Sequence, residues 1–337
     1  LSRGSGVDGL AAMAVRTVRD GADILRPMLG IAKSQLVMTL TARGATWIED
    51  PSNASDTFER VRLRKLEAER VALGLGDRAL ARSARRLGRA RDALDAVTDA
   101  MMEIAIDRPR LERDGLFILP VWLIRELPED IGVRLLMRAL VAVGGAPGRL
   151  RLSRLERLYV AVQRPDFSGA TLGNAILRPA DPAISGRGDG EAALEIYREP
   201  DRGRLPAIIS TLEEPVVWDH RFIVQRVPAG ADAVTVRALE RRDVEKVLGG
   251  EAAELMPFHE ALRSTPVIEE AGGRIFASAL AGEGVAAGNE TASDHYQARF
   301  LVERLFSGTY PGSREFSRVL EMVCAMRDKT GSPGRRD

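Results

Sequence analysis

The most regular hydrophobic pattern in the chain lies between residues 77 and 106. Apolar side chains recur there every seven residues, with further apolar residues between them, at Leu80, Leu87, Leu94 and Met101, and at Ala90, Val97 and Ile104. This spacing predicts one long helix with a packing stripe of the kind found in helical bundles. At ~100° per residue, four arginines fall within about 60° of one another on the opposite side of this helix. They are Arg78, Arg82, Arg85 and Arg89.

The residues before this helix predict two further helices. Residues 32–43 form a helix that ends at Gly44, because glycine stops a helix readily. A second helix begins at Asp56 and runs to about Leu73, with Glu59 reaching back to complete a capping box. The "GLG" that follows breaks the chain, and Asp77 is placed to cap the long helix.

Beyond the long helix the pattern changes from helical to extended. Helices are predicted at 121–143 and 149–163, joined by a "GGAPG" turn. The following apolar runs predict strands in "GATLGNAILRP", "ALEIYREP", "VVWDHRFIVQRV" and "AVTVRAL". Short helices are expected in "RDVEKVLGG" and "AAELMPFHEALR". "VIEEAGGRIFAS" predicts a hairpin with a type I′ Gly-Gly turn. The last part of the chain is predicted to contain a loop at 281–295, helices near 295–306 and 313–328, and a disordered tail.

Composition narrows the class of protein. The 337 residues suffice for two or three domains, and 45% apolar with 29% charged residues indicates a globular chain. No apolar run reaches the ~18 residues of a membrane span. Cys324 is the only cysteine, which excludes a disulfide within the chain. His220, His259 and His295 show no metal-ligand spacing, and we expect a reducing, cytoplasmic location.

Charge is distributed unevenly, although the net charge is only +1. Residues 57–91 contain eleven basic and four acidic residues, whereas residues 181–337 contain twenty basic and twenty-six acidic residues. A basic segment of this kind favours a polyanionic partner. The stretch "DPSNASDTFERVRLR" leads into this segment and places Arg60 and Arg64 one helical turn apart, with Arg62 between them. Either a solvated helix face or a phosphate-binding surface explains these arginines.

No arrangement of side chains in the sequence indicates a catalytic centre. "RGSGVDGL" could form an anion-binding nest, but it lacks the Gly-Lys-Ser/Thr of a P-loop and is better explained as a turn before a helix. Asp219 and His220 are adjacent, and adjacent residues of a strand point to opposite faces. The residues by themselves therefore predict a multidomain nucleic-acid-binding protein.

Three segments follow one another in a fixed order: "RGSGVDGLAAM", "ILRPML" and "WIEDPSNASDTFERVRLR". This order resembles that of the bacterial tRNA(Ile)-lysidine synthetases. The matching positions are Arg3, Gly4, Ser5, Gly6, Gly9 and Leu10; Arg26 and Pro27; Asp50, Ser52 and Asn53; and Arg60, Arg62 and Arg64. Val61 stands where many members have asparagine. The resemblance is specific over residues 1–64 and looser, but collinear, beyond about residue 165.

The resemblance implies a function and a fold class. Family members use ATP and Mg²⁺ to adenylate the wobble cytidine of tRNA(Ile) with a CAU anticodon, and free lysine then displaces AMP. The implied fold is α+β and multidomain. Residues 1–56 would be the remnant of an α/β adenine-nucleotide α-hydrolase-like (PP-loop ATPase) domain, residues 57–205 a mainly helical tRNA-docking domain, and residues 206–337 a small α+β domain. No membrane contact is implied, and a homodimer is left open.

The resemblance also implies roles for particular residues. The edge of the ATP site would be formed by Arg3, Gly4, Gly6, Arg26, Asp50, Ser52 and Asn53. The tRNA backbone or the nucleotide phosphates would be bound by Arg60, Arg62 and Arg64, and the tRNA track would continue along Arg78, Arg82, Arg85 and Arg89.

The chain departs from the family in one respect that bears on activity. Neither the Ser-Gly-Gly-x-Asp-Ser loop nor the His-x-x-Asp-Asp-Gln segment of the family occurs in these 337 residues. We therefore expect an N-terminally truncated member that does not adenylate tRNA alone, and pyrophosphate release from ATP and tRNA by the purified chain would contradict this expectation. Two alternatives stay open, a non-catalytic RNA-binding remnant and a helical interaction module without an RNA partner.

Overall fold

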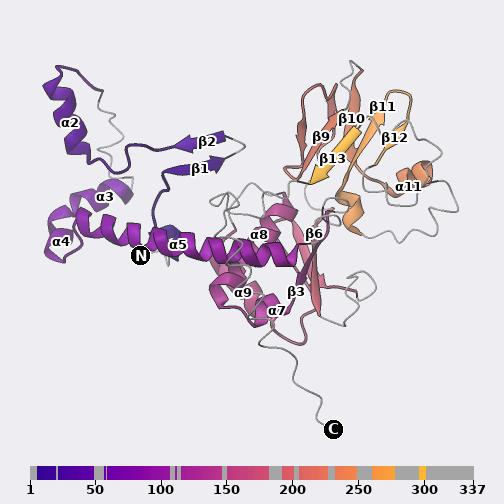
Figure 1. The fold of residues 1–337 in the computed structure, drawn as a ribbon, viewed down its shortest axis with the longest axis horizontal. Helices are drawn as coiled ribbons and strands as arrows, with labels where there is room; N and C mark the ends of the chain where they lie inside the picture. The colour runs from indigo at the N-terminus through magenta and orange to yellow at the C-terminus, as the bar shows by residue number, and fades with distance from the viewer. Residues whose placement is uncertain are drawn as a thin grey trace, which may run out of the picture. The chain divides into compact units, whose positions relative to one another are not determined.

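The computed structural model describes a defined part of the chain. Its residues are 6–19, 22–48, 57, 59–106, 111, 115–145, 150–181, 192–200, 205–226, 232–248, 260–277 and 296–300. The chain divides into two compact units, Leu1–Asp95 and Ala96–Asp337 (Figure 1). None of the described helices combines the length and the apolar character that crossing a bilayer requires.

The first unit begins with small elements. They are α1 (Val7–Leu10), β1 (Arg16–Arg19), β2 (Ala22–Leu25) and α2 (Lys33–Ala42). The two strands form an antiparallel hairpin in which Arg16 pairs with Leu25. Helix α2 ends just before Gly44, whose φ of 61° lies in the left-handed region, so the predicted helix and its stop are confirmed.

The helix predicted from Asp56 to Leu73 is two helices in the structure. These are α3 (Glu59–Lys65) and α4 (Glu67–Ala72), and Leu66 between them leaves helical geometry with ψ of 27°. Asp56 lies outside the described residues, so its capping role stays a prediction. Gly74, with φ of 74°, makes the predicted break before α5 (Asp77–Ala105).

The predicted cap of α5 is not formed as expected. Asp77 is the first residue of the helix, and its Oδ1 accepts hydrogen bonds from Arg70 Nη1 and Nη2 at 3.1 and 3.0 Å. The carboxylate therefore ties α4 to the start of α5. Two charged guanidinium N–H donors on one carboxylate oxygen are a stronger partner than a single backbone N–H, which explains the difference.

The helical part of the second unit contains more breaks than the sequence suggested. The range 121–143 is divided into α7 (Trp122–Arg125) and α8 (Glu129–Gly144), and α9 (Leu152–Val162) follows. Pro128 is the N-cap residue of α8, with φ of −53° and ψ of 142°. Proline disfavours helical geometry in the residue before it, so a continuous helix over this range is excluded.

A four-stranded antiparallel sheet packs against these helices. Its order is β3-β6-β5-β4, with strands β3 (Phe117–Pro120), β4 (Ala170–Leu172), β5 (Ala175–Pro179) and β6 (Ala193–Arg198). β4 and β5 are joined by Gly173 and Asn174, both at φ of 63°, which is a two-residue hairpin of the type I′ class. Helix α8 lies beside β6 (Figure 1). The predicted strand in "ALEIYREP" is confirmed, whereas "GATLGNAILRP" forms two strands joined by a turn, and β3 was not foreseen.

Two smaller antiparallel sheets complete the described fold. The first has the order β12-β11-β10-β7 and the second β13-β9-β8. Their strands are β7 (Ile208–Ser210), β8 (Val216–Trp218), β9 (Phe222–Arg226), β10 (Val234–Ala238), β11 (Pro266–Glu270), β12 (Ile275–Phe276) and β13 (Tyr296–Phe300). The helical pieces are α11 (Arg241–Leu248) and the 3₁₀ helix η2 (Glu260–Ser264).

Two predictions for this region are wrong. Residues 296–300 are not helical but form β13, which pairs with β9 from Tyr296 opposite Arg226 to Phe300 opposite Phe222. The β11–β12 hairpin is confirmed, but only Gly273, at φ of 77°, is left-handed, and Glu270 N–H donates to Arg274 O. The connection is thus a three-residue loop rather than a type I′ turn. The predicted loop at 281–295, the helix at 313–328 and the tail lie outside the described residues.

Candidate nucleic-acid interface

The arginine row of α5 comprises Arg78, Arg82, Arg85 and Arg89. All four side chains are exposed, and they lie on the helical stretch that the sequence predicted. Within the described part of the chain, none of the four guanidinium groups has an ion pair or a hydrogen bond. Four positive charges without acidic partners among the described residues therefore lie along three turns of one helix face, and this arrangement attracts an anionic polymer.

The carboxylates around this row are engaged by other arginines. Asp77 pairs with Arg70 at 3.0 Å, and Asp92 pairs with Arg91 at 2.9 Å. Further along α5, buried Asp99 accepts a hydrogen bond from Arg138 of α8. These acidic groups are thus partnered outside the arginine row, and the positive charge of the row is not offset by them.

The structure describes the backbone of all three arginines of α3 but the side chain of only one of them. Arg60, Arg62 and Arg64 all lie in α3, so the one-turn spacing of Arg60 and Arg64 is realised in the backbone. Arg62 is exposed and has an interaction partner. The side chains of Arg60 and Arg64 lie outside the description, so their phosphate-binding role stays a prediction.

Two of the residues assigned to the edge of an ATP site can be located. Gly6 is the exposed N-cap residue of α1. Arg26 Nη1 donates to Ala14 O at 3.2 Å and to Thr17 Oγ1, so this guanidinium fastens the segment before β1 to the end of β2. Arg3, Gly4, Asp50, Ser52 and Asn53 lie outside the described residues. Among the residues that are described, no cluster of three or more acidic, histidine or cysteine side chains could hold Mg²⁺.

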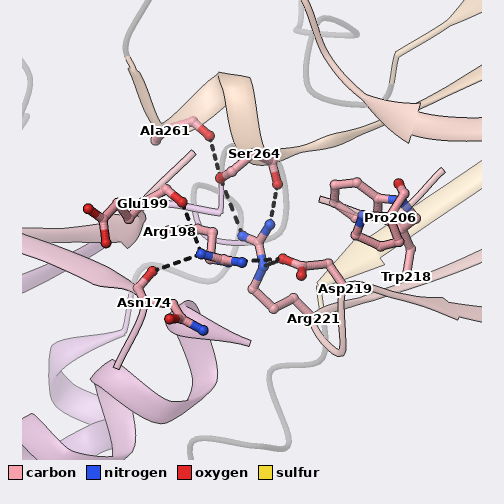
Figure 2. A network of polar contacts seen from close by, with 9 residues as sticks. All are labelled: Asn174, Arg198, Glu199, Pro206, Trp218, Asp219, Arg221, Ala261 and Ser264. Atoms are coloured by element: carbon pink, nitrogen blue, oxygen red, sulfur yellow. Dashed lines mark hydrogen bonds and ion pairs between the residues drawn. The ribbon is translucent and has the colours of Figure 1, made fainter. Parts of the chain in front are cut away.

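A buried polar network that sequence reasoning missed joins three elements of the second unit (Figure 2). Arg221 is fully buried, and its Nε donates to Asp219 Oδ2 at 2.7 Å. Arg198, at the end of β6, donates to the same oxygen at 3.2 Å. Arg221 also donates to the carbonyl and hydroxyl oxygens of Ser264 in η2. One carboxylate therefore serves two guanidinium groups.

The geometry of the β8–β9 turn makes this network. Asp219 and His220 have φ of 47° and 55°, and Arg221 N–H donates to Trp218 O at 3.0 Å, which together form a type I′ turn. The two residues are therefore turn residues, not the strand residues that the sequence suggested. Asp219 points inward to the arginines, whereas His220 is exposed. Burial lowers the pKa of Arg221 to about 10, Asp219 opposes this shift, and Arg198 adds to it.

Close backbone approaches bring this turn and the β4–β5 turn against the end of α8. Gly145 ends α8 in the left-handed region at φ of 61°, and a Cβ there would lie 2.5 Å from Asp219 O. A Cβ on Gly144 would lie 2.0 Å from Gly173 O in the β4–β5 turn. Only glycine fits at these two positions. The network is therefore a structural junction, and it offers no catalytic pair.

Comparison with known proteins gives one match to a family model and several matches to individual proteins. A family model described as the PP-loop domain matches residues 1–69, so this end of the chain is similar to PP-loop domains. The tRNA(Ile)-lysidine synthase of Rhodopseudomonas palustris is 36% identical over 216 residues, covering 61% of this chain and 59% of that protein. The synthase of Anaplasma marginale is 28% identical over 226 residues, or 67% and 46% of the two chains.

A third relative agrees with these two. The tRNA(Ile)-lysidine synthase of Bradyrhizobium diazoefficiens is 36% identical over 172 residues, covering 50% of this chain and 47% of that protein. The chain is a relative of the tRNA(Ile)-lysidine synthases. It spans about half the length of the curated relatives it matches.

Proposed function

We propose that this protein takes part in lysidine formation on tRNA(Ile). In this reaction lysine is ligated to C2 of the wobble cytidine, after ATP has adenylated the base. The names of the relatives and the PP-loop match over residues 1–69 support the proposal. ATP and free lysine are the small substrates, and tRNA(Ile) with a CAU anticodon is the macromolecular one. Mg²⁺ would neutralise charge on the ATP phosphates.

The contribution of the described residues to this function is RNA binding. The observation that carries this assignment is the arginine row of α5, which is exposed and has no ion pair within the described part of the chain. Arginine presents a planar fork of donors that matches a phosphate group. Each phosphate that the row neutralises releases a condensed counterion, and this release drives binding at low salt.

The Ser-Gly-Gly-x-Asp-Ser loop and the His-x-x-Asp-Asp-Gln segment do not occur in these 337 residues. In the proposed reaction the arginines of α3 and α5 position the tRNA. Gly6 and Arg26 border the nucleotide site from α1 and the β1–β2 hairpin, together with Arg3, Gly4, Asp50, Ser52 and Asn53.

Direct titration tests the proposal. A fluorescently labelled, unmodified tRNA(Ile) transcript with a CAU anticodon is titrated with the 337-residue chain, and binding is followed by anisotropy at 50 mM salt. We expect saturable binding that an unlabelled tRNA displaces more effectively than duplex DNA of equal phosphate content, because A-form and folded RNA differ in shape from B-DNA. Absence of saturable binding, or equal displacement by both competitors, would contradict the proposal.

A further inference from the structure

A second group of exposed arginines lies on α9, in the other unit of the chain. Arg151 is the N-cap residue of this helix, and Arg164 follows its C-terminal end by two residues. At ~100° per residue, Arg154 and Arg157, which both lie within the helix, are about 60° apart. The α9 basic face, defined as Arg151, Arg154, Arg157 and Arg164, extends for roughly 20 Å at 1.5 Å per residue. All four side chains are exposed.

The opposite side of α9 is anchored in the second unit. Leu155, Leu158 and Val162 are buried, and Tyr159 O–H donates to Ile124 O at 3.2 Å. A Cβ at Gly132 of α8 would lie 2.6 Å from the Tyr159 ring, so the two helices approach closely at that point. Figure 1 shows α9 beside α7. The helix is therefore fixed in orientation, and its basic face is presented to solvent.

Acidic groups do not neutralise this face. Within the described residues, none of its four guanidinium groups forms an ion pair; Arg157 Nε donates to Ser153 O at 3.1 Å. Tyr159, which anchors α9, is about 160° around the helix from Arg157.

The arginines at the start of α9 do not stabilise this helix electrostatically. Arg151 and Arg154 lie at the N-terminal turn, where the positive end of the helix dipole disfavours cations. Arg154 and Arg157 are a like-charge pair at i, i+3, which is also unfavourable. A bound anion would offset both effects. Binding, rather than helix stability, therefore accounts for positive charge at these positions.

We propose that the α9 basic face is a second binding surface for the sugar–phosphate backbone of a folded RNA. This inference rests on the proposed function, and it adds a surface in a unit separate from that of the α5 row. The exposed apolar residues of α9, Leu152 and Val160, lie outside the 60° arc of Arg154 and Arg157. The face therefore offers aligned charge without the apolar anchors that characterise protein–protein interfaces.

The test measures the salt dependence of binding to the tRNA(Ile) transcript. In the 337-residue chain, Arg154, Arg157 and Arg164 are changed together to glutamine. Log affinity falls as log salt rises, and each lost phosphate contact reduces the steepness of this slope by about 0.7 to 0.9. We expect the slope to fall by about two and the affinity at 50 mM salt to fall roughly tenfold or more. The lysine variant, R154K/R157K/R164K, should retain most of the slope because it retains the charge.

A matched control removes three positive charges from elsewhere in the same unit. R241Q/R242Q/R274Q changes exposed arginines of which Arg242 and Arg274 have carboxylate partners, Glu240 and Glu270. This variant should leave the slope unchanged. An unchanged slope in the α9 glutamine variant, or an equal loss in the control, would overturn the inference. If the parent chain binds tRNA and only α5 substitutions weaken binding, the proposed function stands while this inference fails.

Discussion

Asp219 is the single residue on which the buried network of the second unit depends. Its Oδ2 accepts hydrogen bonds from both Arg198 and Arg221, and Arg221 is fully buried. Removing one partner of a buried ion pair leaves an uncompensated charge, which costs more than replacing the whole pair with apolar groups. The carboxylate, rather than either guanidinium, is therefore the sensitive position.

Substitution of Asp219 by asparagine tests this directly. Asparagine tolerates the left-handed conformation as well as aspartate does, so the type I′ turn is preserved and only the charge is removed. We expect the free energy of unfolding to fall by about 3 kcal/mol, as measured by urea denaturation. Arg221→Met, which removes a buried charge and keeps an apolar stem, should cost clearly less. A smaller loss for Asp219→Asn than for Arg221→Met would contradict this account.

For individual residues, the sequence predicted which side chains share a helix face but not which residues they contact. The spacing of Arg78, Arg82, Arg85 and Arg89 follows from helical periodicity, so their shared face was predictable. The burial of Arg221 was not, because it depends on contacts with Ser264, which is 43 residues away in the sequence. The α9 basic face carried a signal in "RLSRLERLYVAVQR", since its arginines and its buried leucines occupy different sides of one helix.

Helix α5 was the element best predicted from sequence. Its range and its seven-residue stripe are confirmed, but the stripe is buried only toward its C-terminal end. Leu80 is 39% exposed, whereas Met101 is 1% exposed. The pattern of apolar residues identifies the face that can be buried, and the amount of burial depends on what packs against it.

Alanine substitutions along this stripe should therefore differ in effect. Met101→Ala removes a fully buried side chain and should lower the free energy of unfolding by about 2–5 kcal/mol. Leu80→Ala removes an exposed side chain and should change it by about 0.5 kcal/mol or less. Both are measured by urea denaturation under the same conditions. Equal losses would mean that the stripe is packed along its whole length.

Short strands were missed where the sequence shows no alternation of apolar and polar residues. β3 has four residues, all buried, so it shows no alternation and lies directly before α7. β7 has only three residues. "YQARF", which forms β13, fits both a two-residue and a helical period over so short a stretch, and its pairing with β9 decides the outcome. The turn formed by Gly173 and Asn174 was not predicted, although glycine and asparagine both favour the left-handed geometry found there.

The two units of the molecule differ in how much apolar surface they bury. In the described part of Leu1–Asp95, Val61 is the only buried apolar side chain, whereas Ala96–Asp337 contains the rest of the described core. Since burial of apolar area is the main stabilising term, most of the stability of the described structure arises in the second unit. The match to the PP-loop domain falls entirely in the first unit.

At the scale of the whole molecule, the resemblance to lysidine synthetases was visible in residues 1–64, and the comparisons support it. The order of the strands in the three sheets of the second unit could not be predicted. Strand pairing joins segments distant in sequence, and each antiparallel edge offers several partners of similar apolar character.

The most direct measurement of the central claim is the salt dependence of tRNA binding after removal of the α5 arginine row. Arg82, Arg85 and Arg89 are changed together to alanine, which preserves the helix. The slope of log affinity against log salt should fall by about two to three, because each arginine releases about one counterion. The lysine triple variant should keep the parent slope. An unchanged affinity and slope in the alanine variant would show that the row is a solvated face and would contradict the proposed function.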